Sequence, residues 1–323
     1  MPQRPPSRPS GRPRGGPVPP SPTGRPVTKK QRRRLAQQGP VKVLRPWWQQ
    51  PWVLTGGGAA VVVAVVIIAV LVFTSSSAPA YTVSTPTAVP SSVLSAVTAP
   101  PVSLFGSVGE GGSSGYLNRL GSTATVKNSA GLPEVVYVGA EYCPYCAAER
   151  WPLIMALSRF GTFTGLKEMS SSNTDVFPDT SSFTFVDSAY TSQYISFSAT
   201  EAVDRDGNAL QTPTSAVQDL FNTYDYSPYS SGAGGYPFLD IAGEFVLAQT
   251  SFSPQILQGL SWSQIAADLS DPSSSVTAAI VGTANYLTAA ICNADGDQPS
   301  SVCGSSVVQS ISTNIMAEST VGG

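Results

Sequence analysis

The segment Val135-Val136-Tyr137-Val138-Gly139-Ala140-Glu141-Tyr142-Cys143-Pro144-Tyr145-Cys146 contains the pattern that decides the fold. Its first four residues are wholly apolar and lie between Pro133 and Gly139, which is typical of a short strand buried on both faces. From Ala147 to Phe160 the apolar residues have helical spacing, and Gly161 marks the expected end of that helix. The two cysteines are therefore expected where a buried strand passes into a helix.

A Cys-x-x-Cys motif at the start of a helix has the chemistry of a redox pair. Only a thiolate attacks a disulfide, and the unpaired N–H groups at a helix N-terminus favour the thiolate. We expect Cys143 to be the nucleophile and Cys146 to be the resolving thiol that closes onto it. Pro144 fits the first helical turn, where its missing N–H is not needed.

Two other interpretations of this motif were weighed. Cys143 and Cys146 form half of a zinc site if Cys292 and Cys303 supply the other half, but ten residues separate the second pair instead of two to four. Exported proteins also favour disulfides. A purely structural disulfide between Cys143 and Cys146 would stabilise little, because the loop that it closes is so short. The sequence thus favours a redox pair and implies no metal.

The chain has no histidine. This excludes His-based acid–base catalysis, Ser-His and Cys-His dyads and His-ligated metals. It also excludes c-type haem attachment, because Ala147 follows the Cys-x-x-Cys motif where that attachment needs histidine. No cofactor is implied.

Charge and hydropathy predict a membrane anchor. Residues 1–50 contain twelve Lys or Arg and no acid, whereas residues 51–323 contain six basic and twenty acidic residues. Residues 53–73 have no charge over 21 residues, which as a helix spans the roughly 30 Å hydrocarbon core. The positive-inside rule places the N-terminus in the cytoplasm and the chain after residue 74 outside. The alternative is a signal peptide cleaved after Ala80, but the apolar run and the tail before it are both too long.

The segments on either side of the predicted span have biased compositions. Residues 1–52 are basic and rich in Pro, Arg and Gly, which predicts a disordered cytoplasmic tail that is attracted to anionic lipids. Nucleic-acid binding is not expected, since residues 1–46 lack interleaved aromatic residues. Residues 74–104 are uncharged and rich in Ser, Thr and Pro, which predicts an extended stalk.

The remaining chain alternates strand and helix patterns. Strand-like stretches cover Phe183 to Val186 and Tyr194 to Phe197, and a helix is expected from Thr214 to Tyr224. Two short apolar runs around Ala242-Gly243-Glu244 indicate a β-hairpin over Phe238 to Leu247. Helical patterns follow over 261–270, 274–292 and 305–317.

Cys292 and Cys303 flank a loop between the last two predicted helices. The simplest interpretation is a structural disulfide that staples a C-terminal helical hairpin over 273–318, separate from a folded domain over 105–272. The alternative is a second redox pair that relays electrons to Cys143 and Cys146.

Cys143-Pro144-Tyr145-Cys146, the strand before it, a helix containing Pro152, and Tyr236-Pro237 before a hairpin together resemble the thioredoxin superfamily. The resemblance implies an α/β, thioredoxin-like fold, here with an insertion between the Cys-x-x-Cys helix and the strand after Pro237. It also implies a cis peptide bond at Pro237 beside the redox pair, and contact of Tyr236 with the substrate backbone. A trans proline that begins an edge strand is the alternative.

Three further stretches are similar to the uncharacterised "domain of unknown function 929" group of actinobacterial membrane proteins: Gly139 to Trp151, Ser158 to Gly161, and Leu257 to Trp262. This resemblance covers roughly residues 104–303 and brings no established activity. Many thioredoxin relatives have a buried acid at the strand position that Tyr137 occupies here. Glu141 is the nearest carboxylate and becomes the candidate for proton transfer, although an acid at that position is more often a solvated strand-end residue.

These observations predict a membrane-anchored, extracytoplasmic thiol–disulfide oxidoreductase that acts on protein disulfides or on a redox partner. The alternative from another class is a non-catalytic, thioredoxin-like domain that serves as a cell-surface binding or structural platform.

Overall fold

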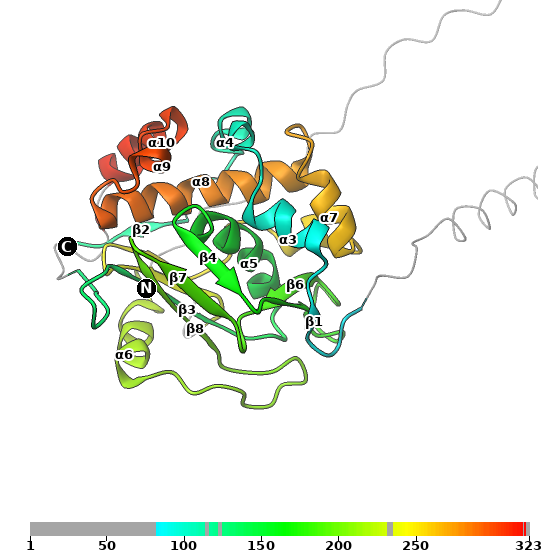
Figure 1. Cartoon of the computed structure of the whole chain (residues 1–323). Coiled ribbons are helices and arrows are strands. Elements are labelled where there is room, and N and C mark those ends of the chain that lie inside the picture. The colour runs from blue at the N-terminus through cyan, green and yellow to red at the C-terminus, as the bar shows by residue number, and fades with distance from the viewer. Residues whose placement is uncertain (1–81, 114–115, 122–124, 231–234, 319, 321–323) are drawn as a thin grey trace, which may run out of the picture. The chain divides into compact units, whose positions relative to one another are not determined.

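Figure 1 shows the computed structural model of the chain, which describes residues 82–113, 116–121, 125–230, 235–318 and 320. All the elements below belong to one compact unit, Ser75–Gly323. The predicted tail over 1–52, the predicted span over 53–73 and the possible cleavage after Ala80 lie outside the described residues.

A five-stranded sheet with the order β2-β10-β9-β3-β8 lies at the centre of this α/β domain. Strand β3 (Glu134–Gly139) pairs in parallel with β8 (Ser196–Glu201) and antiparallel with β9 (Phe238–Ile241). Strand β10 (Phe245–Leu247) forms a hairpin with β9, and β2 (Asn118–Arg119) pairs with β10 at the edge. The hairpin was predicted with these bounds, and its turn is formed by Ala242 and Gly243 at positive φ.

The side chains of β3 alternate between the two faces of the sheet, as the pleat of a strand requires. Val135 and Tyr137 belong to the larger hydrophobic cluster, whereas Val136 and Val138 belong to a second cluster. The second cluster is covered by Val217 of α6 (Ser215–Tyr224), which Thr214 caps at its N-terminus. The structure confirms the prediction of a strand that is buried on both faces.

On the opposite face of the central sheet, two long helices contribute many residues to the larger hydrophobic cluster. α5 (Pro144–Leu157) follows β3 directly and packs against α8 (Ser275–Asp295). Among the described residues, α8 is long enough and apolar enough to cross a membrane. However, 89% of its most apolar 18-residue stretch is buried inside the domain. Such burial is typical of a core helix, and this is not the span predicted over 53–73.

The N-terminal part of the described chain folds onto this domain. β1 (Thr87–Ala88) pairs with β5 (Lys167–Ser170), and the helices α3 (Ser91–Thr98) and α4 (Val102–Val108) follow. This corrects the extended stalk that was predicted over 74–104, because residues 82–104 contain packed elements. The segment folds because it carries a short apolar stripe. Val93 and Val97 lie one helical turn apart on α3, and both are fully buried.

The insertion between α5 and Pro237 consists mainly of strands, as the sequence predicts. β4 (Gly161–Thr164) pairs with β7 (Ala189–Ser192), and β5 pairs with β6 (Ser181–Thr184) in the small sheet that includes β1. The first predicted strand, over 183–186, lies two residues earlier as β6, and the second corresponds to the start of β8.

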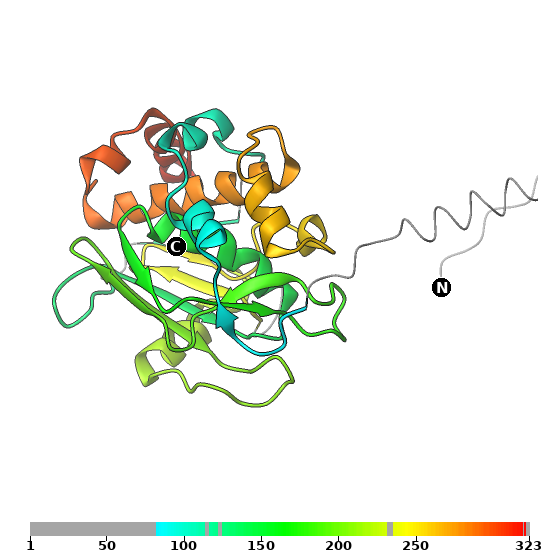
Figure 2. The same cartoon turned by 45° about the vertical axis from the view of Figure 1, so that its right-hand side comes forward.

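The C-terminal helices complete the helical layer. They are η2 (Pro254–Leu257), α7 (Trp262–Asp268), α8, α9 (Ser300–Cys303) and α10 (Ser306–Ala317). α10 packs on α8, which agrees with a helical hairpin, but α8 also packs on α5 and the hairpin therefore belongs to the common core. Figure 2 shows this helical layer on one side of the central sheet and α6 on the other.

Candidate functional site

Cys143 and Cys146 lie at the junction of β3 and α5, where the sequence places them. Cys143 is the N-cap of α5, and its sulfur accepts a hydrogen bond from the backbone N–H of Cys146 at 3.3 Å. Both cysteines are free thiols. Cys143 is 5% exposed and Cys146 is fully buried, so the first thiol alone lies within reach of a second molecule.

Tyr236 and Pro237 lie beside the first thiol. The peptide bond between them is cis, which confirms that part of the prediction. The Cys143 thiol donates to the Tyr236 carbonyl oxygen, with 3.6 Å between sulfur and oxygen. Pro237 immediately precedes β9, the central-sheet neighbour of β3, and this adjacency brings a residue so distant in sequence to the redox pair.

The two thiols have pKa values that are shifted in opposite directions. The hydrogen bond from the Cys146 thiol is the main cause that lowers the pKa of Cys143, and the Cys146 N–H and the Arg150 charge act in the same direction, against burial. Burial raises the pKa of Cys146 well above its ordinary value, and the hydrogen bond to Cys143 raises it further. A thiolate is the reactive form, so this asymmetry favours Cys143 as the nucleophile.

A buried ion pair lies behind the thiols. Arg150 follows Cys146 by one helical turn, and its guanidinium donates to Glu201 of β8 through Nε at 2.9 Å and through Nη2 at 2.6 Å. Nη2 also donates to the carbonyl oxygen of Ala140 at 2.8 Å. Both charged side chains are almost completely buried. The sequence analysis missed this pair, and the spacing of Arg150 from Cys146 was the available signal.

Tyr137 occupies the strand position at which the thioredoxin resemblance implies a buried acid. Its side chain is fully buried, and the Arg150 guanidinium carbon lies 5.8 Å from the centre of its ring. Within the described ranges its hydroxyl has no hydrogen-bond partner of standard geometry, although it interacts with the Cys146 thiol. Burial is the main cause that raises the pKa of Tyr137 well above its ordinary value.

Glu141 is buried, which differs from the solvated strand-end alternative. Only 4% of it is exposed, and its carboxylate accepts a hydrogen bond from the Thr184 hydroxyl of β6 at 2.6 Å. Burial raises its pKa, while the Thr184 hydrogen bond opposes that shift. The structure thus pairs Glu141 with a hydroxyl of the inserted strands, and its role in proton transfer stays a prediction.

A groove opens beside Tyr142, the residue that precedes the nucleophile. Its volume is about 540 Å³, within the usual range for binding pockets. Its walls come from the segment between β3 and α5, the loop after β5 and the loop after β8. The residues that line it are Tyr142, Ser172, Thr174, Asp175, Val176, Val203, Arg205, Asp206 and Gly207.

The second cysteine pair is separate from this site. Cys292 of α8 and Cys303 of α9 form a disulfide with Cα atoms 5.6 Å apart, and both lie in the larger hydrophobic cluster. Cys143 and Cys146 lie in a different cluster with Ala140. Across the part of the chain that the structure describes, no group of three or more Cys, Asp or Glu residues is placed to hold a metal ion.

Comparison with known families gives one match. The model of the family described as "Domain of unknown function (DUF929)" matches residues 124–293, which are 170 of the 323 residues. The matched region contains Cys143, Cys146, Tyr236 and Pro237, whereas Cys303 lies beyond it. Comparisons with curated proteins and with solved structures gave no match.

Proposed function

The chain belongs to this family of unknown function, and we propose that it is a thioredoxin-like thiol–disulfide oxidoreductase that acts on protein disulfides. The observation that carries the proposal is the asymmetry of the cysteine pair. Cys143 caps a helix, keeps 5% of its surface exposed and has a lowered pKa, whereas Cys146 is fully buried and has a raised pKa.

The arrangement of the central sheet supports a thioredoxin-like fold. The parallel strands β3 and β8 are joined through α5 and the insertion, and β9 and β10 continue the sheet as an antiparallel hairpin. The Cys-x-x-Cys motif lies at the β3–α5 junction, and Tyr236-Pro237 lies directly before β9. These are the relative positions that the resemblance implies for the redox pair and the proline.

The proposed reaction is thiol–disulfide exchange in two steps. The Cys143 thiolate attacks one sulfur of a substrate disulfide, so that a mixed disulfide forms and the other substrate sulfur leaves as a thiolate, which takes up a proton. Cys146 then loses its proton and attacks the Cys143 sulfur. This closes the enzyme disulfide and releases the second substrate thiol. The enzyme loses two electrons and the substrate disulfide gains them, and the reverse sequence oxidises a substrate dithiol.

The burial of Cys146 fits its proposed role in the second step. A high thiol pKa keeps Cys146 protonated while Cys143 attacks, and this prevents charge repulsion between two adjacent thiolates. Formation of the mixed disulfide removes the negative charge of Cys143, which lowers the cost of ionising Cys146. The Tyr236 carbonyl, 3.6 Å from the Cys143 sulfur, is the proposed acceptor for a main-chain N–H of the substrate.

A test of this function uses the full-length protein in detergent micelles and the reduction of insulin disulfides by dithiothreitol. We expect wild type to accelerate the reaction, Cys143→Ser to abolish the acceleration, and Cys146→Ser to accumulate a mixed disulfide with insulin. Replacement of both Cys292 and Cys303 by Ala leaves the other pair in place and serves as the matched cysteine control. Equal inertness of wild type and Cys143→Ser, together with an ordinary pKa for Cys143, would support the non-catalytic binding domain instead.

We also propose that residues 53–73 anchor the protein, with the domain on the extracytoplasmic side. The support is the uncharged 21-residue stretch after a basic tail. The expected result is that wild type stays in the membrane pellet after alkaline carbonate extraction, whereas deletion of residues 53–73 releases it. Protease added to intact spheroplasts should digest the domain and leave the tail, and the opposite pattern would overturn the orientation.

A further inference from the structure

The groove beside Tyr142 borders the redox pair and combines apolar walls with charged side chains. Tyr142, Val176 and Val203 give it apolar walls, and Val176 is 66% exposed without a substrate. Tyr142 and Val203 also pack against the cluster that contains both thiols. The groove therefore lies within reach of a chain whose sulfur meets Cys143.

The free charge in the groove is negative. Asp175 and Asp206 line it, and Asp206 is exposed. The cation that lines it, Arg205, is 8% exposed and forms an ion pair with Asp179, at 2.6 Å between Nη2 and Oδ1. The guanidinium charge is thus compensated within the protein, whereas among the described residues neither Asp175 nor Asp206 forms an ion pair.

Arg205 also provides a donor without a partner. Within the described ranges, its Nε–H lies in a buried position and makes no hydrogen bond. An unpaired buried donor is costly, and a shift of the Arg205 side chain that opens Nε to the groove would let an acceptor from a bound molecule satisfy it. A main-chain carbonyl of an extended polypeptide is such an acceptor, and this favours a polypeptide substrate over a small disulfide.

We propose that this groove binds an extended polypeptide segment in which a Lys or Arg lies next to the cysteine that reacts with Cys143. The inference rests on the proposed thiol–disulfide exchange and names its substrate class. The cationic side chain meets Asp175 and Asp206, the apolar walls hold the neighbouring residues, and Arg205 bonds a carbonyl of the segment.

The experiment compares two synthetic peptides that differ only in Lys or Glu beside a single cysteine, each as its disulfide with mercaptoethanol. The reduced full-length protein with Cys146→Ser attacks each peptide disulfide, forms the mixed disulfide and releases a thiol. Each rate is divided by the rate of the same peptide with a small neutral thiol, which removes intrinsic differences between the peptides. The disulfide of mercaptoethanol alone is the neutral probe.

We expect the Lys peptide to react about tenfold faster than the Glu peptide at low ionic strength, and the ratio to fall towards one in high salt. Asp175→Asn with Asp206→Asn should reduce the ratio to near one, with each rate divided by that of the neutral probe in the same variant. Asp219→Asn with Asp268→Asn changes the same charge elsewhere and should leave the ratio intact.

The inference is overturned if wild type shows no charge preference while the neutral probe reacts, or if the groove variant and the control variant behave alike. Failure of the proposed function gives a different result, because the neutral probe then reacts no faster than an ordinary free thiol.

Discussion

Arg150 and Glu201 form a buried ion pair that joins the redox helix α5 to strand β8, with 2.6 Å between Nη2 and Oε2. The same guanidinium nitrogen holds the Ala140 carbonyl at the end of β3. The pair thus ties together the three elements that surround Cys146. Its positive member lowers the pKa of both thiols.

The pKa of Cys143 should respond with opposite signs to two changes in this pair. Glu201→Gln leaves the Arg150 charge uncompensated and is expected to lower the pKa of Cys143. Arg150→Met combined with Glu201→Gln removes that charge and is expected to raise the pKa of Cys143, because its thiolate then loses a favourable positive neighbour. The measurement is the pH dependence of iodoacetamide alkylation of Cys143.

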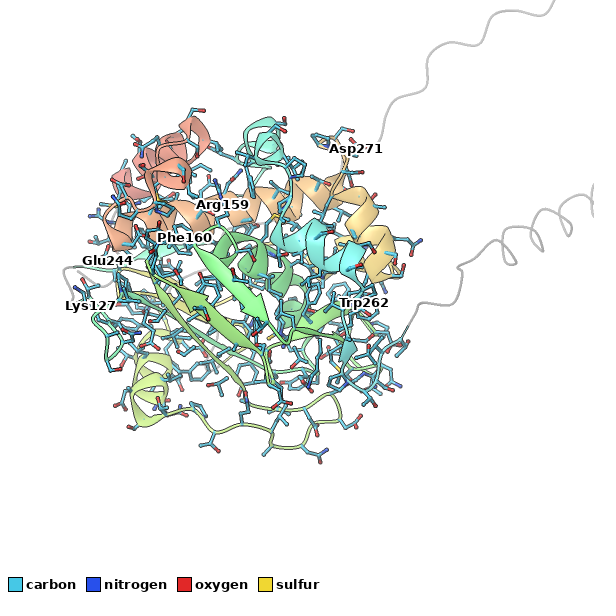
Figure 3. All side chains as sticks on the ribbon, viewed as in Figure 1. Lys127, Arg159, Phe160, Glu244, Trp262 and Asp271 are labelled. Atoms are coloured by element: carbon cyan, nitrogen blue, oxygen red, sulfur yellow. A yellow bond between two sulfur atoms is a disulfide. The ribbon has the colours of Figure 1, made fainter. Side chains whose placement is uncertain are left out.

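Arg159 provides the matched control for this prediction. It also belongs to the α5 region and is largely buried, but it lies over the Phe105 ring at 4.1 Å and contacts α8 (Figure 3). Arg159→Met is therefore expected to leave the pKa of Cys143 unchanged. Shifts of equal sign in both pair variants would contradict an electrostatic role and indicate a structural one. Glu201→Gln and Arg150→Met alone each leave a buried charge unpaired, which costs about 3–5 kcal/mol of stability, so the unfolding of each variant is measured beside the pKa of its Cys143.

The packing of α3 predicts that residues once assigned to a stalk stabilise the domain. Val97→Ala removes buried methyl groups from a fully enclosed site, and we expect a loss of about 2 kcal/mol in the free energy of unfolding. Val102→Ala, at a position that is 77% exposed on α4, is the control and should have no measurable effect. Urea denaturation measures the free energy of unfolding of wild type and of both variants. Equal values for all three proteins would support the predicted extended stalk instead.

The Cys292–Cys303 disulfide should contribute to stability without taking part in exchange. It closes a loop over a sequence separation of 11, for which chain entropy gives about 3 kcal/mol. Replacement of both cysteines by Ala should lower the melting temperature while preserving the reduction potential of Cys143 and Cys146. The two cysteine pairs lie in separate clusters, which argues against an electron relay between them. A shift of the reduction potential in the double variant would instead favour the relay.

Asp240 should make the domain less stable as the pH rises. Its side chain is fully buried on β9, where Oδ1 accepts from the Gly243 N–H at 2.9 Å, and burial raises its pKa to about 7. In the unfolded chain its pKa is about 3.9, so between these values the folded state binds the extra proton. The stability that this proton provides is fully present below about pH 4 and is lost as the pH rises to about 7.

The test compares the free energy of unfolding of wild type and Asp240→Asn between pH 5 and pH 8. In wild type, Asp240 is expected to lower the free energy of unfolding by at most about 1.4 kcal/mol for each unit of rising pH. Asp240→Asn should remove this contribution to the slope. Asp219→Asn changes an exposed acid of α6 and should keep the wild-type slope. Identical slopes for wild type and Asp240→Asn would mean that Asp240 titrates normally.

Short-range patterns identified most of the elements that surround the site. β3 was recognisable because it is apolar on both faces, and the β9–β10 hairpin because its turn is short and glycine-containing. Cys143 and Cys146 followed from their position between a strand and a helix. Tyr236-Pro237 required the resemblance, since only the pairing of β3 with β9 brings it to the thiols.

Long-range partners were harder to predict. In the sequence, Glu201 is a single acidic residue at the end of a predicted strand. The residues around it do not indicate that parallel pairing with β3 places it opposite Gly139. α3 was missed because its Ser, Thr and Ala residues resemble a linker, while only Val93 and Val97 report its burial. The packing of α8 against α5, across the predicted division at residue 272, was missed for a similar reason, because α8 begins 118 residues after α5 ends.

The burial of Val83 in the domain also limits the working radius of the proposed enzyme. A 31-residue stalk over 74–104 would give a reach of roughly 100 Å, at about 3.4 Å for each extended residue. With the proposed anchor ending at Phe73 and Val83 already buried in the domain, the tether has at most about ten residues and a reach of about 35 Å. Substrates that diffuse far from the bilayer are then out of range. The natural clients of Cys143 should be newly exported chains and neighbouring membrane proteins, whose cysteines come close to the lipid surface.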